Sequence, residues 1–65
     1  MITVCGKELE GLEGRTIVEM LKELGYKNTY IAVEMNGEIL KRENYSSTVL
    51  KENDRLEVVN FVGGG

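Results

Sequence analysis

The chain has no histidine and a single cysteine, Cys5, among its 65 residues. Histidine is the commonest general base and the commonest metal ligand in proteins, so its absence counts against an enzyme and against a metal site. One cysteine cannot form an internal disulfide. Without a histidine to activate it, this thiol is a poor candidate for a persulfide carrier. We predict that Cys5 is a small buried hydrophobic residue instead.

Basic clusters and long apolar runs are also scarce. The net charge is −3, and Lys41-Arg42 is too short to form a nucleic-acid patch, although it suits an acidic partner. The apolar run after Met1 is too short for a signal peptide or a membrane span. We therefore expect a cytoplasmic protein that binds neither nucleic acid nor a membrane.

The length and composition are those of one small globular domain. The chain is 42% hydrophobic and 29% charged, and its length is near the lower limit for folding without disulfides or metals. Glu8, Glu10 and Glu13 are spread over a predicted strand and loop. They fit a solvated surface better than a metal site or an acid pair, so we predict no metal ligands.

The N-terminal residues predict a hairpin. Residues 1–5 alternate weakly between apolar and other side chains, as in a strand. Gly6-Lys7 suits a two-residue turn, in which the first position often has a positive φ. Residues 8–12 then return as a second strand, with Leu9 as a candidate for the core.

A capped helix follows over residues 16–24. Thr16 and Glu19 form a capping box, in which each side chain accepts a hydrogen bond from a backbone N–H at the helix start. Gly25 fits the left-handed position that ends many helices. Apolar residues recur with helical spacing on one face, at Ile17, Met20, Leu21 and Leu24.

A second hairpin and a last strand complete the pattern. Residues 30–35 read as a strand, Asn36-Gly37 is a strong hairpin turn, and residues 38–40 supply its partner. We expect Tyr45 to anchor the polar loop that comes next.

Asn53 is a candidate for the left-handed conformation in the turn before the last strand, residues 55–62. Within that strand, Leu56 and Val58 share one face and should point toward the helix.

The element order is hairpin, helix, hairpin, loop, strand. We predict an α+β domain of the β-grasp (ubiquitin-like) type, a mixed sheet of four to five strands covered on one face by a single main helix. The first and last strands should form a parallel central pair. The domain would span residues 1–62, with residues 63–65 as a flexible tail.

The other face of the last strand carries a possible docking patch. Val59 and Phe61 point away from the helix in this scheme, and Tyr30 and Met35 can join them. Scattered surface apolar residues are ordinary, but grouped ones often mark a partner surface.

Three glycines follow this strand and end the sequence, Gly63-Gly64-Gly65. Glycine has no Cβ, so such a segment can enter a narrow channel. One interpretation is a frayed terminus, since chain ends are commonly disordered. The other is an α-carboxylate presented to a second protein for activation.

Taken together, these features resemble the ThiS family, the ubiquitin-like sulfur carrier proteins of thiamin biosynthesis. The resemblance covers the whole chain. One departure is Asn53, where the family commonly has glycine, but asparagine tolerates the same backbone conformation. The features that carry the resemblance are the Gly6-Lys7 hairpin, the capped helix that ends at Gly25, the Asn36-Gly37 hairpin and the final segment Glu57-Val58-Val59-Asn60-Phe61-Val62-Gly63-Gly64-Gly65.

The resemblance implies a carrier that performs no catalysis, binds no cofactor and is a monomer when free. A ThiF-type adenylating enzyme would use ATP to convert the Gly65 carboxylate into an acyl adenylate. A sulfur donor protein would then replace AMP, and the thiocarboxylate would deliver sulfur to a ThiG-type thiazole synthase. Gly64 and Gly63 would supply a thin approach to each active site. Val62, Phe61 and Val59 would contribute to docking.

Other functions stay open at this point. The chain can be a sulfur carrier for molybdopterin or another metabolite, although such carriers are usually somewhat longer. It can also be a ubiquitin-like tag that forms amide bonds with lysines. A third possibility is a β-grasp binding module of the kind appended to RNA-associated enzymes, which the acidic charge disfavours.

Overall fold

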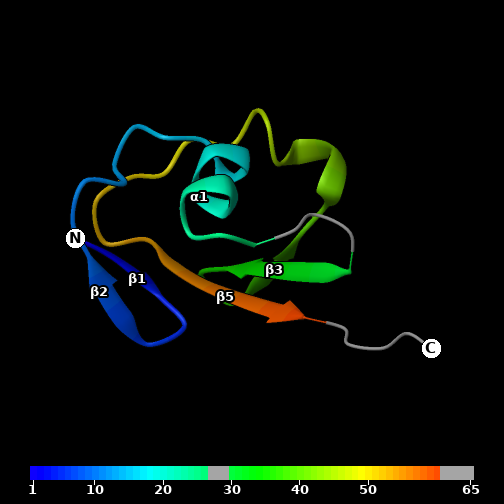
Figure 1. Cartoon of the computed structure of the whole chain (residues 1–65), viewed down its shortest axis with the longest axis horizontal. Coiled ribbons are helices and arrows are strands. Elements are labelled where there is room, and N and C mark those ends of the chain that lie inside the picture. The colour runs from blue at the N-terminus through cyan, green and yellow to red at the C-terminus, as the bar shows by residue number, and fades with distance from the viewer. Residues whose placement is uncertain (27–29, 61–65) are drawn as a thin grey trace.

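The computed structural model describes residues 1–26 and 30–60 of the chain. Within these residues, five strands form one sheet in the order β2-β1-β5-β3-β4, and a single α-helix covers one of its faces (Figure 1). The mixed sheet and its covering helix confirm the predicted β-grasp fold. In chain order the elements are β1 (Ile2–Val4), β2 (Lys7–Leu9), α1 (Ile17–Glu23), β3 (Ile31–Met35), β4 (Glu38–Leu40), the 3-10 helix η1 (Arg42–Asn44) and β5 (Arg55–Asn60).

The central strand is β5, which pairs with β1 on one side and with β3 on the other. The β1–β5 pair is parallel, with Val4 opposite Leu56, as predicted for the first and last strands. The β3–β5 pair is antiparallel and extends from Met35 opposite Leu56 to Ile31 opposite Asn60. Because β1 ends opposite Leu56, the second residue of β5, only β3 accompanies β5 to its last described residue.

The ends of α1 follow the predicted signals. Thr16 Oγ1 accepts a hydrogen bond from the Glu19 N–H at 3.2 Å, and the Thr16 N–H donates to Glu19 Oε1 at 2.9 Å. At the other end Gly25 has a φ of +85°, and the Tyr26 N–H donates to the Leu21 carbonyl at 2.9 Å. These bonds pair backbone groups that the helix itself leaves without partners.

Replacing Thr16 by alanine is expected to lower the free energy of unfolding by about 1 kcal/mol, because the capping hydroxyl is lost. Urea denaturation followed by circular dichroism measures the change. Thr16→Ser retains the hydroxyl and is the matched control, which should recover most of the loss. Equal stability of the alanine and serine variants would show that the cap contributes nothing.

The core lies between α1 and the sheet and includes loop residues. Tyr45 is 3% exposed, so it anchors the polar loop as predicted. Leu24 departs from the prediction because it is 37% exposed. It is the C-cap residue of α1, one position after the last helical residue, Glu23. The buried residues are Ile2, Val4, Leu12, Ile17, Met20, Leu21, Ile31, Val33, Tyr45, Leu50 and Leu56.

The second hairpin is as predicted, whereas the first is shifted by one residue. Asn36 and Gly37 occupy their turn with φ values of +53° and +87°. In the first hairpin the turn residues are Cys5 and Gly6, with φ values of +51° and +82°, and not Gly6-Lys7. Lys7 instead begins β2. A two-residue turn of this kind needs a positive φ at both positions, and glycine adopts the second without strain.

Contacts with β5 explain why Cys5 occupies the first position of that turn. Its N–H donates to the Leu56 carbonyl at 2.8 Å, and its Sγ accepts the Val58 N–H at 3.3 Å. The residue is exposed, so the prediction of a small buried hydrophobic residue is wrong. Strand β2 ends at Leu9, before the predicted residue 12, and Leu9 packs half-buried against the core.

The turn before β5 contains the predicted left-handed residue, since Asn53 has a φ of +73°. Across residues 1–26 and 30–60, no helix combines the length and the hydropathy needed to cross a bilayer.

Candidate functional site

The predicted sulfur-carrying residues, Gly65 and Gly64, lie outside the described residues. So do three of the predicted docking residues, Gly63, Val62 and Phe61, and with them the boundary between domain and tail. Among the predicted site residues, the structure therefore places Val59. It also describes β5, the strand that leads toward the tail.

β5 packs against the core with one face and is paired along both of its edges. Leu56 is 1% exposed and Val58 packs half-buried against the core, so both point toward α1 as predicted. Asn60, the last described residue, is paired with Ile31 of β3. Backbone pairing with β3 therefore fixes the position of the chain up to Asn60, three residues before the first residue of the predicted tail, Gly63.

The face of the sheet opposite α1, called the outer face below, carries exposed apolar side chains. Val59 is 48% exposed and lies opposite Ala32 of β3, which confirms that it points away from the helix. Ile39 is 74% exposed on β4, and Tyr30, directly before β3, is 62% exposed. The sequence reasoning did not include Ile39. Its position between Glu38 and the half-buried Leu40 was the available signal.

Met35 does not belong to this patch, and its predicted place there is wrong. It pairs with the buried Leu56 and packs against the core, on the same side as Val33. Side chains alternate between the two faces of a strand. Tyr30 and Met35 are five positions apart, so a continuous strand cannot place both on one face.

The outer face also carries two carboxylates in direct opposition. Glu34 of β3 is paired with Glu57 of β5, and like charges directly opposite each other on one face repel. With Arg55, Asn36 and Gly37 they line a shallow depression of about 530 Å³. The outer face therefore combines exposed apolar groups with a local negative charge.

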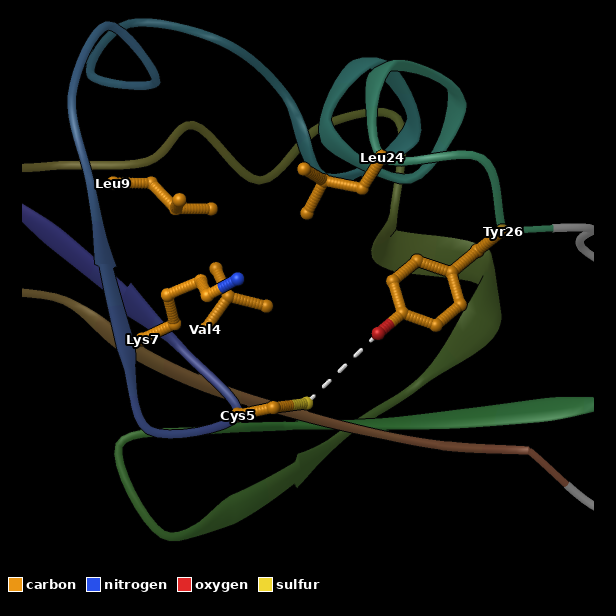
Figure 2. A pocket seen from close by; sticks show the side chains of 6 residues that line it. All are labelled: Val4, Cys5, Lys7, Leu9, Leu24 and Tyr26. Carbon is orange, nitrogen blue, oxygen red and sulfur yellow. Dashed lines mark hydrogen bonds between the residues drawn. The ribbon is translucent and has the colours of Figure 1, made fainter.

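Cys5 lies on the helix-covered side of the sheet margin, near Tyr26. Its Sγ is 4.0 Å from the Tyr26 Oη (Figure 2). Burial raises the pKa of the Tyr26 phenol above its ordinary value, and the contact with Cys5 adds to this increase. The phenol therefore stays protonated at neutral pH and can donate a hydrogen bond.

The three N-terminal glutamates do not come together. Glu8 and Glu10 are exposed, while Glu13 lies 3.5 Å from the Met1 ammonium, which also contacts Glu52. Within residues 1–26 and 30–60, no group of three or more acidic, cysteine or histidine side chains is arranged to bind a metal.

Comparisons with known proteins agree over the whole chain. The model of the ThiS family matches residues 2–65. The sulfur carrier protein ThiS of Bacillus subtilis is 35% identical over 66 aligned residues, which cover 100% of both chains. A crystal structure of the thiamine biosynthesis protein ThiS from Geobacter metallireducens superposes with a TM-score of 0.79 at 39% identity, covering 98% of this chain and 97% of that one.

Two longer relatives are named thiazole synthase. That of Magnetococcus marinus is 42% identical over 52 residues, and that of Paramagnetospirillum magneticum is 34% identical over 64 residues. The matches span only 16% and 20% of the length of these two proteins, so each contains a segment similar to this chain and much else besides. The family match, the full-length relative and the superposed structure agree: the chain belongs to the ThiS family.

Proposed function

We propose that this chain is a sulfur carrier of thiamin biosynthesis, and that the Gly65 carboxylate is the group that carries the sulfur. The observation that supports this most directly is the end-to-end match with the Bacillus subtilis sulfur carrier, at 35% identity over 100% of both chains. The β-grasp fold and the family match over residues 2–65 agree with it. In this role the chain is a protein cosubstrate and not a catalyst.

The proposed chemistry begins with activation, because a carboxylate is a poor electrophile. A carboxylate oxygen of Gly65 attacks the α-phosphate of ATP on a ThiF-type enzyme and displaces pyrophosphate. The terminal sulfur of a persulfide on the donor protein then attacks the acyl carbon, and AMP leaves. A thiol reduces the remaining sulfur–sulfur bond and releases the thiocarboxylate. In this scheme ATP is bound by the adenylating enzyme, and the carrier holds no cofactor.

The last residues of the sequence suit such a handover. Gly63 and Gly64 have no side chains, so only the width of the backbone has to pass into the active site of each partner. β5 supplies a fixed base for them, because it is the central strand and its pairing with β3 continues to Asn60. A fixed base favours docking, since less conformational freedom is lost when the partner binds.

The outer face is the proposed docking surface for the adenylating enzyme. Val59 and Ile39 offer exposed apolar area, and the Glu34–Glu57 pair offers negative charge. A partner that buries the apolar groups and places a basic side chain near the two carboxylates would relieve their repulsion. We assign Phe61 and Val62, the next two residues in the sequence after Asn60, to the same interface.

A ThiG-type thiazole synthase is the proposed acceptor of the sulfur. Two proteins named thiazole synthase contain a segment similar to this chain, which supports a functional link between the two activities. We propose that the handover takes place in the cytoplasm and that the free carrier is a monomer.

Reconstitution followed by intact-mass measurement tests the proposal. The chain is incubated with ATP, a ThiF-type adenylating enzyme and a persulfide-loaded sulfur donor protein. The expected product is heavier by the difference between a sulfur and an oxygen atom, and the same reaction without ATP is the control. Amide adducts with lysines of added proteins, without this sulfur-containing product, would favour a conjugation tag and overturn the proposal.

A further inference from the structure

A groove of about 380 Å³ lies between the first hairpin and the C-terminal end of α1 (Figure 2). It opens on the helix-covered side of the sheet, away from the outer face. None of its lining residues belongs to β3, β4 or β5, so it is separate from the proposed docking surface. The lining residues are Val4, Cys5, Lys7, Leu9, Leu24 and Tyr26.

One wall of the groove is formed by Lys7 and Leu9 of β2, and this strand has an open edge. β2 is the outermost strand on this side of the sheet and pairs only with β1, with Glu8 opposite Thr3. The Thr3 N–H is directed toward β5, where it donates to the Asp54 carbonyl at 3.0 Å. Thr3 and Glu8 are therefore a non-hydrogen-bonded pair, and the backbone N–H and C=O of Glu8 point outward. In the described part of the chain neither group has a partner.

The floor and the opposite wall of the groove are mostly apolar. Val4 is buried beneath it, Leu9 is half-buried, and Leu24 is 37% exposed at the end of α1. A segment that pairs with the edge of β2 would direct alternate side chains toward these residues. The groove therefore offers two kinds of contact to an extended apolar segment. The open edge of β2 can pair with its backbone, and the exposed Leu24 can contact one of its side chains.

A single charged side chain enters the groove. Figure 2 shows the Lys7 side chain directed over Val4, on the side that faces Leu24 and Tyr26. None of the ion pairs among residues 1–26 and 30–60 includes Lys7. An ammonium group without a carboxylate partner, beside an apolar wall, favours a ligand that brings a negative charge.

We propose that this groove binds an extended segment of a partner protein, with an apolar side chain and a neighbouring carboxylate. The segment adds a strand to β2 through the backbone of Glu8, places its apolar side chain between Leu9 and Leu24, and pairs its carboxylate with Lys7. This interaction goes beyond sulfur transfer, because it uses no residue of the predicted tail. It would allow a partner to hold the carrier while the tail occupies an active site.

Selection from a peptide library tests the inference. The library contains acetylated and amidated hexapeptides in which threonine alternates with a randomised apolar residue, and each ends in either Glu or Lys. The peptides that bind most tightly are expected to end in Glu. At saturation they should slow the alkylation of Cys5 by iodoacetamide, because this thiol lines the groove and is the only cysteine in the chain. They should also shift the amide resonances of Lys7, Glu8 and Leu24.

Two variants and one modified peptide make the test specific. Lys7→Glu is expected to reverse the preference for Glu over Lys at the peptide end, with a change of about fivefold in each affinity. Lys41→Glu has the same charge change outside the groove and should leave the preference intact. N-methylation of the backbone of a selected peptide removes the donors that pair with the strand edge, so its binding should be lost.

Four outcomes would overturn the inference. These are failure of every library peptide to protect Cys5, shifts confined to the outer face, an unchanged charge preference in Lys7→Glu, and unimpaired binding of the N-methylated peptide. Protection of Cys5 without peptide, rising with protein concentration and lost on removal of residues 61–65, would instead identify the occupant as a second copy of this chain. Thiocarboxylate formation is measured separately, so the inference about the groove can be refuted while the proposed function stands.

Discussion

Deleting Gly64 and Gly65 is expected to abolish thiocarboxylate formation and to leave the free energy of unfolding unchanged. The truncated chain ends two residues short, so its carboxylate no longer reaches the reacting phosphate, although every residue of the described core is retained. Loss of alignment between reacting groups typically costs a factor of about 100 or more in rate. Intact mass after incubation with the adenylating enzyme, ATP and the sulfur donor measures the product.

Substitution at Gly64 separates the need for length from the need for a narrow segment. Gly64→Phe retains the position of the terminal carboxylate but adds a bulky side chain, so we expect no thiocarboxylate. Gly64→Ala is the matched control, because it adds a single methyl group and should lower the rate less. Normal product formation by Gly64→Phe would refute the narrow-channel argument. Product formation by the truncated chain would refute the assignment of the carboxylate itself.

Signals that act within a few residues allowed much of the fold to be predicted from the sequence. Thr16 and Glu19 bind each other's backbone across one turn, so their pairing depends on nothing distant. The Asn36-Gly37 turn is also local, since both residues tolerate a positive φ. These signals defined the helix and the second hairpin, and the element order then indicated the β-grasp sheet.

The first hairpin could not be predicted to the residue because its turn depends on a distant strand. Cys5 adopts a positive φ while its N–H binds the Leu56 carbonyl and its sulfur accepts the Val58 N–H. These partners are more than fifty residues away in sequence. No feature of the first six residues shows that contact, so Gly6 was assigned to the wrong position of the turn.

The outer face was predicted in part, for a different reason. Val59 was placed correctly, because the alternation of β5 can be followed from Leu56. Met35 was misplaced because it was grouped with Tyr30, although the two are five positions apart and an odd separation places side chains on opposite faces of an extended chain. Placing Ile39 on the outer face requires the register between β4 and β3, in which Ile39 lies opposite Glu34.

The groove and the tail are two further features that the sequence alone could not predict. The groove requires the first hairpin and the end of α1 to lie side by side, which is a tertiary relation between Leu9 and Leu24. The chemistry of Gly65 was inferred from the family resemblance and not from any spacing of residues. The family match supports it over residues 2–65, and its test is the reconstituted reaction.

The largest expected effect on stability is that of Leu56→Ala. Leu56 is 1% exposed in the central strand, opposite Met35 and beside Val4. Removing a buried leucine side chain leaves a cavity and typically costs about 2–5 kcal/mol. A domain of this length has a total stability of only about 3–10 kcal/mol, so the variant should lose a large part of it. If it folds, its melting temperature should fall by about 10–25 °C.

Val59→Ala is the matched control on the same strand. Val59 is 48% exposed on the outer face, so its truncation should change the free energy of unfolding by less than about 0.5 kcal/mol. It should instead weaken binding to the adenylating enzyme, measured by calorimetry. If Val59→Ala destabilises the chain as much as Leu56→Ala, both faces of β5 serve the fold. The side chain of Val59 would then be needed for folding, and the assignment of the outer face as a docking surface would be wrong.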